Sequence, residues 1–413
     1  MRILLSAFAC DPNHGSEPGV GWAWASHLAR SGHDVCVLTR ERFRIALENE
    51  VSKTNSQNLR FIFVDVNRVP YQTPALGTYP YYFAWQFKLY LKVARLVRKN
   101  RPDCIHHITY ASYRTPFLLS LLGVPSIFGP VGGGEASPMA LTRGMSFSAR
   151  ARELGRHVAR LFRFLNPITT LVWRHSTLIL LTTEETLRMV PAKYHPKCRV
   201  LPAVTTPSPI TAVNARRRRT DGTLRVLFVG RILEWKGLHL ALPALKIARR
   251  RVPGIHLTIV GDGESKPRIQ ALVEAEGQQD AVEWISRIPR RQVLELYGQH
   301  ELLVFPSLHD SGGTVILEAF SYGMPVICLN LGGPGVLVDS SCGASIDTNG
   351  QSFEQVVDAI ADELVRFSRM SDPEEQAIRE AAFARAQQFS LGRVAGQAYA
   401  WFAEMQGATP SPK

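Results

Sequence analysis

The sequence lacks the features that mark several classes of protein. Its 413 residues include only six cysteines, and none of them is spaced as a CxxC pair. This scatter argues against a zinc ribbon and is typical of proteins of a reducing compartment. No DxD sequence occurs, and no group of His, Cys and Asp has the spacing of metal ligands. We therefore expect no metal and no cofactor.

A continuous membrane-spanning segment is also missing. The longest uncharged stretch, 115–134, is interrupted by Pro116, Pro125 and Pro130, which break any helix there. The apolar run within the first ten residues is too short for the core of a secretory signal. We expect a first strand at that place and a cytoplasmic protein.

The excess of positive over negative charge is confined to the first half of the chain. Residues 1–205 contain 26 Lys and Arg against 12 Asp and Glu, whereas the whole chain contains 48 against 35 and has a net charge of +13. We expect the first half to meet an anionic partner, unless the second half simply carries more solvating acids.

Short apolar runs alternate with longer segments of helical spacing, which predicts parallel strands buried on both faces. We predict an α/β protein with two doubly wound, Rossmann-like domains, an N-terminal one over 1–205 and a C-terminal one over 206–388, followed by a helix in 389–413. The predicted strands are 3–8, 35–38, 61–64, 104–107, 126–128 and 178–181 in the first half, and 225–229, 256–260, 282–285, 302–305 and 326–329 in the second.

The halves are joined by a segment with several prolines and the run Arg216–Arg219, without any periodicity. The arginines suit a nucleic-acid or localisation patch, but a solvated linker is the preferred interpretation. Two such domains would leave a cleft at the carboxyl ends of their strands, where these sheets bind ligands.

Charged residues follow two predicted strands of the second half. Arg231 comes directly after a strand and Lys236 lies at the start of a helix, so the two cations can clamp a diphosphate. Farther along, Ser311 to Thr314 offer unhindered backbone N–H groups at another helix start, which favours an anion. Glu318 lies in an apolar stretch of that helix, and a buried carboxylate there needs a partner such as a ribose diol.

In this order, the motifs resemble those of the retaining nucleotide-sugar glycosyltransferases of family 4, which have the two-domain GT-B architecture. The resemblance extends over nearly the whole chain and is strongest from residue 225 to 335. The motifs that carry it are the pairs Gly230-Arg231 and Lys236-Gly237, the segment from Asp310 through seven residues to Glu318, and the pair Gly332-Gly333.

The resemblance implies a role for each matching residue of the second half. Arg231 and Lys236 would bind the donor diphosphate, and Glu318 the ribose. Asp310, where the family usually has Glu, would act near the donor sugar hydroxyls, and Ile288 would pack against the base. Backbone support for phosphate would come from Gly312, Gly313, Thr314 and Val315. The final helix would cross back to the N-terminal domain.

In the first half, the loop after the first strand contains Gly19 and Gly21, whose backbone can approach a ligand closely. The resemblance places this loop, with Glu17, against the donor diphosphate or the acceptor. It also places a catalytic His at His106 or His107. Because adjacent strand residues face opposite sides, we expect only one of the two to reach the sugar, and we favour His107. Glu135 would orient an acceptor hydroxyl, or is an exposed loop acid.

The resemblance implies glycosyl transfer from a nucleoside diphosphate sugar to a glycan or lipid-linked acceptor, with retention, in cell-surface glycan synthesis. A nucleotide-sugar epimerase of the same architecture and, less favoured, a basic nucleic-acid-binding protein are the alternatives.

Two segments of the first half carry an apolar stripe at helical spacing. These stripes would either lie on an anionic membrane at its cytoplasmic face or pack on the core. The first consists of Phe83, Phe87, Tyr90, Leu91, Ala94 and Val97, and the second of Phe147, Ala151, Leu154, Val158, Leu161, Phe162 and Leu165.

Overall fold

The computed structural model describes residues 1–14, 16–54, 56–67, 69–73, 77–161, 166–206 and 222–407. The Arg216–Arg219 run of the expected linker lies outside the described residues, as do Phe162, Leu165 and the tail from residue 408. The chain forms two compact units. The first comprises Met1–Gly134, Phe162–Ala203 and Leu391–Lys413, and the second comprises Glu135–Leu161 and Val204–Ser390.

The first unit is built on a parallel sheet of seven strands. They are β1 (Arg2–Ser6), β2 (Asp34–Thr39), β3 (Leu59–Phe63), β4 (Cys104–His107), β5 (Ser126–Val131), β6 (Leu178–Leu181) and β7 (Cys198–Val200). Their order in the sheet is β3-β2-β1-β4-β5-β6-β7. Most inner strands are runs of apolar residues because helices cover both faces of the sheet.

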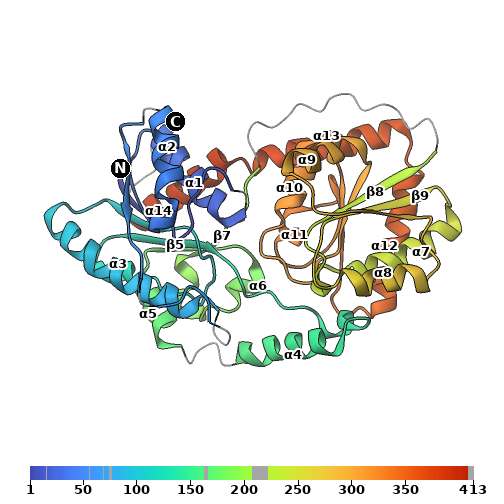
Figure 1. Ribbon diagram of the computed structural model, residues 1–413, viewed down its shortest axis with the longest axis horizontal. Coiled ribbons are helices and arrows are strands. Elements are labelled where there is room, and N and C mark those ends of the chain that lie inside the picture. Colours follow the sequence, from blue (N-terminus) through green and yellow to red (C-terminus); the bar gives the residue numbers. More distant parts are fainter. Residues whose placement is uncertain are drawn as a thin grey trace. The chain divides into compact units, whose positions relative to one another are not determined.

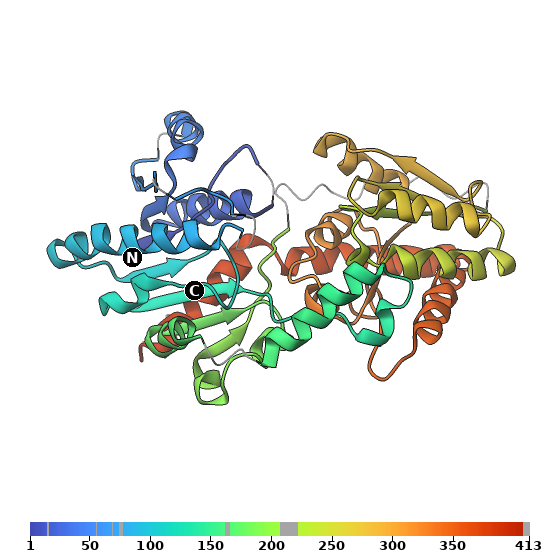
Figure 2. The same ribbon diagram turned by 60° about the horizontal axis from the view of Figure 1, so that its bottom comes forward.

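Helices α1 (Ser16–Arg30) and α14 (Leu391–Met405) contact each other and pack on one face of this sheet. Helix α3 (Tyr79–Lys99) packs on the opposite face, with α5 (Pro167–His175) (Figure 2). The hydroxyl of Tyr399 in α14 lies 3.1 Å from Nδ1 of His106 in β4, so this last helix is part of the first unit. The remaining helices of the unit are α2 (Arg44–Thr54) and α6 (Glu184–Leu187), and its 3-10 turns are η1 (Glu41–Phe43), η2 (Leu118–Leu122) and η5 (Ala192–Lys197).

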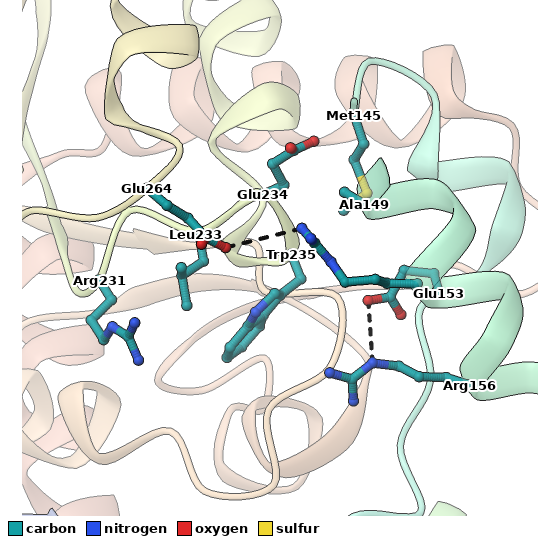
Figure 3. Close-up of a pocket in the computed structure, with 10 residues that line it drawn as sticks. Met145, Ala149, Glu153, Arg156, Arg231, Leu233, Glu234, Trp235 and Glu264 are labelled. Carbon is teal, nitrogen blue, oxygen red and sulfur yellow. Dashed lines mark ion pairs between the residues drawn. The ribbon is translucent and has the colours of Figure 1, made fainter. Parts of the chain in front are cut away.

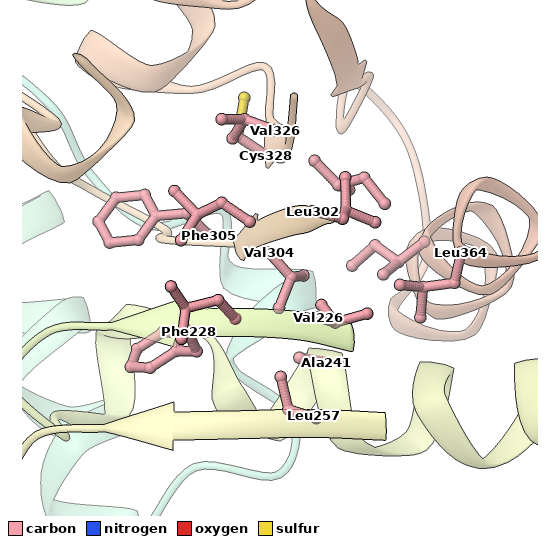
Figure 4. Close-up of a cluster of buried hydrophobic side chains, with 14 of the residues drawn as sticks. Val226, Phe228, Ala241, Leu257, Leu302, Val304, Phe305, Val326, Cys328 and Leu364 are labelled. Carbon is pink, nitrogen blue, oxygen red and sulfur yellow. The ribbon is translucent and has the colours of Figure 1, made fainter. Parts of the chain in front are cut away.

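The second unit has a parallel sheet of six strands. They are β8 (Leu224–Val229), β9 (Ile255–Val260), β10 (Val282–Ile285), β11 (Leu302–Phe305), β12 (Val326–Leu329) and β13 (Gly343–Ile346), in the order β10-β9-β8-β11-β12-β13. Buried side chains of neighbouring strands interdigitate, and the rings of Phe228 and Phe305 lie 6.3 Å apart (Figure 4). Burying such a ring contributes roughly 2 kcal/mol, which fixes these strand ends in the core.

Helices cover both faces of this sheet as well (Figure 1). One face carries α7 (Leu238–Arg251), α8 (Lys266–Ala275) and α12 (Phe353–Ser368), which contact one another through α7. The other carries α10 (Thr314–Ser321), which contacts α9 (Arg290–Gln299), α11 (Gly332–Leu337) and α13 (Asp372–Gln388). The predicted α/β class, doubly wound in each unit, is confirmed.

One segment of the first half of the sequence folds with the second unit. Residues 135–161, which we expected in the N-terminal domain, contain η3 (Met139–Thr142) and α4 (Phe147–Leu161) and belong to the second unit. His239 of α7 lies 3.0 Å from the carbonyl oxygen of Leu141, and Glu234 accepts hydrogen bonds of 2.5 Å from the backbone and hydroxyl of Ser146. The apolar stripes of helices do not reveal such a change of unit.

Candidate functional site

The first group of site residues follows β8. Arg231 is exposed at the end of this strand, and a 3-10 turn, η6 (Glu234–Lys236), then leads into α7. Gly237 has a φ of +82°, and a Cβ atom there would lie 1.9 Å from the carbonyl oxygen of Pro306. The glycine therefore lets η6 lie directly against the chain that leaves β11, next to β8 in the sheet.

This close approach brings Lys236 to Asp310. The ammonium Nζ donates to Oδ2 of Asp310 at 2.5 Å, and the two side chains are only 12% and 18% exposed. The same Nζ lies 4.4 Å from the ring of Trp235 and 4.7 Å from the ring of Phe305. An ammonium held by aromatic faces and one carboxylate is ordered and keeps hydrogen atoms for a further anion.

Asp310 also occupies the start of α10. Its Oδ1 accepts hydrogen bonds from the backbone N–H groups of Gly312 at 3.1 Å and Gly313 at 3.3 Å. The carbonyl oxygen of Asp310 accepts from the N–H of Gly333 at 2.6 Å. A carboxylate held in this way shows that the backbone donors here favour negative charge, as at other helix N-termini. Thr314 and Val315, the remaining predicted phosphate-supporting residues, form the first positions of α10.

Glu318 lies one turn farther along α10 and already has partners. Its Oε1 accepts from Arg290 Nη2 at 2.8 Å, and its Oε2 accepts from the hydroxyl of Tyr297 at 3.2 Å. The phenol of Tyr297 is fully buried; burial first, and the neighbouring Glu318 second, raise its pKa well above the ordinary value. The sequence predicted that this carboxylate needs a partner, but it did not identify Arg290 or Tyr297. Ile288 is partly buried against the core of the unit.

A cavity of about 210 Å³ adjoins Arg231 in the second unit (Figure 3). Part of its wall comes from α4, where Arg152 lies 4.0 Å from Glu264 and Arg156 lies 3.5 Å from Glu153. Two arginines of α4, Arg152 and Arg156, therefore face this cavity and its carboxylates. The lining residues are Met145, Ala149, Arg152, Glu153, Arg156, Arg231, Leu233, Glu234, Trp235 and Glu264.

Residues 135–161 also hold the loop that carries Asp310. Oε1 of Glu153 lies 3.1 Å from Nε2 of His309, whose ring stacks on Trp235 with centroids 4.4 Å apart. Burial opposes ionisation of Glu153, but His309, with help from Ser137 and Arg156, outweighs burial and lowers the pKa of the carboxyl. Sequence reasoning missed this pair, although His309 directly precedes Asp310 in the motif.

Glu135 provides a second attachment to the same loop. Its Oε2 accepts a hydrogen bond of 2.8 Å from the hydroxyl of Ser311, and its side chain is buried. The alternative of an exposed loop acid is therefore wrong. The expected contact with an acceptor hydroxyl stays a prediction, and the structure places Glu135 with the residues predicted to bind the donor.

The predicted residues of the first unit lie around the start of α1. The carboxylate of Glu17 accepts from the backbone N–H groups of Tyr110 and Ala111, which follow β4. A Cβ atom at Gly19 would lie 2.4 Å from the carbonyl oxygen of His14, and one at Gly21 would lie 2.1 Å from that of Ala9. Both glycines are thus required for close packing of α1 on its own loop, and their contact with a ligand stays a prediction.

The two histidines of β4 are fully buried. His106 lies 2.7 Å from the carbonyl oxygen of Gly129, and burial lowers its pKa to about 4 despite this bond. His107 stacks on Phe128 on the opposite face; burial, and then His106, lower its pKa to about 3. Neither imidazole reaches the surface, because the chain stays buried beyond the end of β4, through Ile108 and Thr109. The sugar contact expected of His107 or His106 is not offered by this geometry.

Comparison with known proteins finds glycosyltransferase families that match both halves of the chain. Residues 212–383 match the family described as glycosyl transferases group 1, and residues 19–204 match the glycosyl transferase 4-like domain. A glycogen synthase of Mycobacterium tuberculosis is 35% identical over 124 residues, which are 30% of this chain and 30% of that protein. The chain thus aligns with less than a third of the length of this relative.

Two solved structures are similar over the whole chain. Sucrose-phosphate synthase from Thermosynechococcus elongatus has a TM-score of 0.63 at 18% identity, over 99% of this chain and 100% of that one. Anabaena Alr3699/HepE, solved with UDP-glucose, has a TM-score of 0.56 at 16% identity, over 98% of this chain and 100% of that one. At such identities the likeness concerns the fold alone. Because the two family matches together extend over both units, the chain belongs to the group 1 glycosyltransferases.

Proposed function

We propose that the protein transfers a glycosyl group from a nucleoside diphosphate sugar to an acceptor hydroxyl and retains the anomeric configuration. The observation that carries the proposal is the group formed by Lys236, Asp310 and the backbone N–H groups at the start of α10. An ordered cation beside backbone N–H groups that already bind a carboxylate is an arrangement that can neutralise a departing diphosphate. UDP-glucose, bound by Anabaena Alr3699/HepE, is the donor we would test first.

In this proposal the two cations after β8 contact the diphosphate from different sides. Lys236 is positioned by Asp310 and contacts the diphosphate from a partly buried place, whereas the exposed Arg231 closes on it from the cavity side. Each charged hydrogen bond contributes about 1.5 to 3 kcal/mol. The donor phosphate would take over the N–H groups of Gly312 and Gly313, which frees the Asp310 carboxylate to accept from the sugar hydroxyls. Glu318 would accept from the ribose.

The reaction breaks the bond between the anomeric carbon and the diphosphate oxygen and forms a bond to the acceptor oxygen. The acceptor proton moves to the departing phosphate. A covalent intermediate would require a nucleophilic carboxylate. Asp310 accepts a hydrogen bond from the ammonium of Lys236, and Glu318 accepts one from Arg290, which weakens both carboxylates as nucleophiles. We therefore propose substitution on the front side of the sugar, without a metal ion.

The proposed acceptor is a glycan or a lipid-linked glycan, and the proposed pathway is the synthesis of cell-surface polysaccharide. An epimerase of the same architecture would need no acceptor, so the products separate the two. Incubation with nucleoside diphosphate sugars, with and without a glycan acceptor, should give a new glycosidic bond only with acceptor. Proton NMR of the first product should show the donor's anomeric configuration. Inversion of the anomeric carbon would contradict retention, and epimerised donor without acceptor would contradict transfer.

Donor binding can be tested separately from turnover. A thermal-shift panel of uridine, guanosine and adenosine diphosphate sugars should raise the melting temperature with one base in preference to the others. The shift grows with the ratio of ligand concentration to Kd. If no nucleoside diphosphate sugar stabilised the protein, the proposed donor site would be wrong.

A further inference from the structure

The sequence predicted that the apolar stripe of helix α3 either packs on the core or lies on a membrane, and the structure leaves part of this stripe exposed. Its other face packs inward through Tyr82, Leu89 and Val93, which are fully buried. Phe87 and Leu91, by contrast, are 54% and 51% exposed, and Phe83 is 37% exposed. Packing on the core is therefore wrong for Phe83, Phe87 and Leu91, whereas Tyr90 and Val97 of the same stripe are partly buried against the core of the unit.

The exposed stripe continues into a groove beside the helix. Phe83 lines a small cavity of about 60 Å³ together with side chains of η2 and α5, among them Leu121 and Leu171. These two leucines are 36% and 42% exposed. Ser120 is the one hydroxyl at the cavity, and it donates to the carbonyl oxygen of Phe117 at 2.8 Å. Three elements thus form one continuous apolar surface of the first unit.

The charges around this surface have a single sign. The elements α3, η2 and α5 contain no Asp or Glu, whereas α3 alone contains five Lys and Arg. Arg95 lies one helical turn after Leu91, and Arg98 lies one turn after Ala94, so both exposed guanidinium groups border the stripe. This surface matches a partner that is apolar and carries negative charge.

We propose that the apolar surface of α3, η2 and α5 docks the protein on an anionic lipid bilayer. Phe83, Phe87 and Leu91 would enter the boundary of the acyl chains, and Arg95 and Arg98 would contact headgroup phosphates. A second copy of the chain fits less well, because a two-fold contact through this surface would bring its cations against one another. The docking requires neither donor nor acceptor and is independent of the proposed function.

Helix α4 provides a natural comparison. Phe147 and Leu154 are 88% and 54% exposed, but Arg152 and Arg156 face the cavity beside Arg231 and lie near Glu264 and Glu153. The exposed Arg150 lies one turn before Leu154, so a cation borders the apolar side of α4 as well, whereas two cations, Arg95 and Arg98, border the stripe of α3. Among the described residues, no helix is long and apolar enough to cross a membrane, so docking would rest on surface contacts.

The test is flotation of the full chain with vesicles of phosphatidylglycerol and phosphatidylcholine, compared with phosphatidylcholine alone. The protein should float with the anionic vesicles only. The double variant Phe87→Ser with Leu91→Ser should lower binding by about tenfold or more, because each loses an inserted apolar group. The variant Arg95→Gln with Arg98→Gln should also lower it, and high salt should have the same effect.

The matched control carries Leu154→Ser and Val158→Ser, which change similarly exposed side chains of α4. It should float like the unmodified protein, and all variants should keep their melting temperature because the replaced side chains are exposed. Failure to bind anionic vesicles, or equal loss in the α4 control, would overturn the proposal. If light scattering showed that the unmodified protein is a dimer and that only the α3 variant is a monomer, the surface would belong to a contact with a second copy instead. Nucleotide-sugar binding of each variant, measured in parallel, tests the proposed function separately.

Discussion

The two units place β4 and β11 at equivalent positions, each beside the first strand of its sheet, yet they present very different chemistry. In the first unit the polar residues, His106 and His107, belong to the strand itself and are fully buried. In the second unit Asp310 follows the strand by five residues and is partly exposed beside Lys236. The comparison teaches that polar residues at the end of a parallel strand are accessible when they lie in the loop after the strand and not in the strand itself.

The physical reason is the direction of side chains in a sheet that is covered on both faces. Strand residues point alternately into two helix layers, so an imidazole in β4 is desolvated whichever face it takes. Loop residues instead lie at the sheet edge, where glycines allow neighbouring loops to approach. Gly237 and Gly333 do this in the second unit and bring the chains after β8, β11 and β12 together.

The strongest test of this difference between the units is to remove Lys236, the cation beside Asp310. Lys236→Ala should weaken donor binding by about 10- to 100-fold, because a charged hydrogen bond contributes about 1.5 to 3 kcal/mol. Isothermal titration with the nucleoside diphosphate measures the change. Lys246→Ala is the control, since Lys246 has an equally short bond of 2.5 Å to Glu276 on α7 and α8. Equal binding by both variants would refute the site.

The second prediction concerns the buried carboxylate of α10. Arg290→Ala would leave Glu318 with the hydroxyl of Tyr297 as a hydrogen-bond partner. The free energy of unfolding should fall by about 1 to 2 kcal/mol, less than for a fully buried pair, because Arg290 is half exposed. Arg291→Ala breaks an exposed pair with Glu295 and should cost less than about 0.5 kcal/mol. Urea denaturation of both variants measures the difference. Indistinguishable midpoints would show that Glu318 does not depend on Arg290.

The third prediction tests the histidines of β4 through pH. Their pKa values of about 4 and about 3 lie below the ordinary 6.5, so the folded protein keeps them neutral while the unfolded chain binds protons below pH 6.5. Their contribution to stability is complete above pH 6.5 and is lost as the pH falls towards these values. At pH 5.5 the loss should be about 1 kcal/mol for each imidazole.

Chemical denaturation between pH 5 and 8 measures this slope. His106→Gln should reduce the slope, whereas His175→Asn, which changes an exposed histidine, should leave it unchanged. If instead kcat/KM followed an ionisation near pH 6.5 that His107→Asn abolished, the histidine would titrate as an accessible group and the buried geometry would be wrong.

The smallest expected effect concerns the attachment of α4 to the loop that carries Asp310. Glu153→Gln weakens the contact with His309 and should raise the KM for the donor about threefold while kcat changes less, because the loop loses part of its positioning. Glu264→Gln is the control, since its contact with Arg152 is 4.0 Å long and exposed. Steady-state kinetics with varied donor measure both. An unchanged KM in Glu153→Gln would show that α4 does not position the loop.

Much of the fold followed from local patterns. The runs at 104–107, 178–181, 282–285, 302–305 and 326–329 have the predicted bounds because each is a short apolar run between turns. The strands β7 and β13 were missed. Cys198–Val200 is a three-residue edge strand, and Gly343–Ile346 begins with Gly, Ala and Ser, so neither shows the bulky apolar signal of an inner strand.

For the site, residue types and spacing predicted Lys236 and Glu318, and the family resemblance predicted Asp310; the structure places Lys236 after β8, Asp310 after β11 and Glu318 within α10. Their partners could not be predicted, because Arg290, Tyr297 and Glu153 come from elements with no sequence motif. Whether a histidine at a strand end is exposed also depends on residues far away, here Tyr399 and Phe128.

The sequence by itself determined the parallel sheets, the glycines where loops cross and the charges that follow β8 and β11, since each depends on local periodicity or on backbone conformation. Only the tertiary structure decided that residues 135–161 join the second unit, that the β4 histidines are desolvated, and that Phe83, Phe87 and Leu91 of α3 stay exposed. Burial and partner choice arise from contacts between residues hundreds of positions apart, which local patterns do not encode.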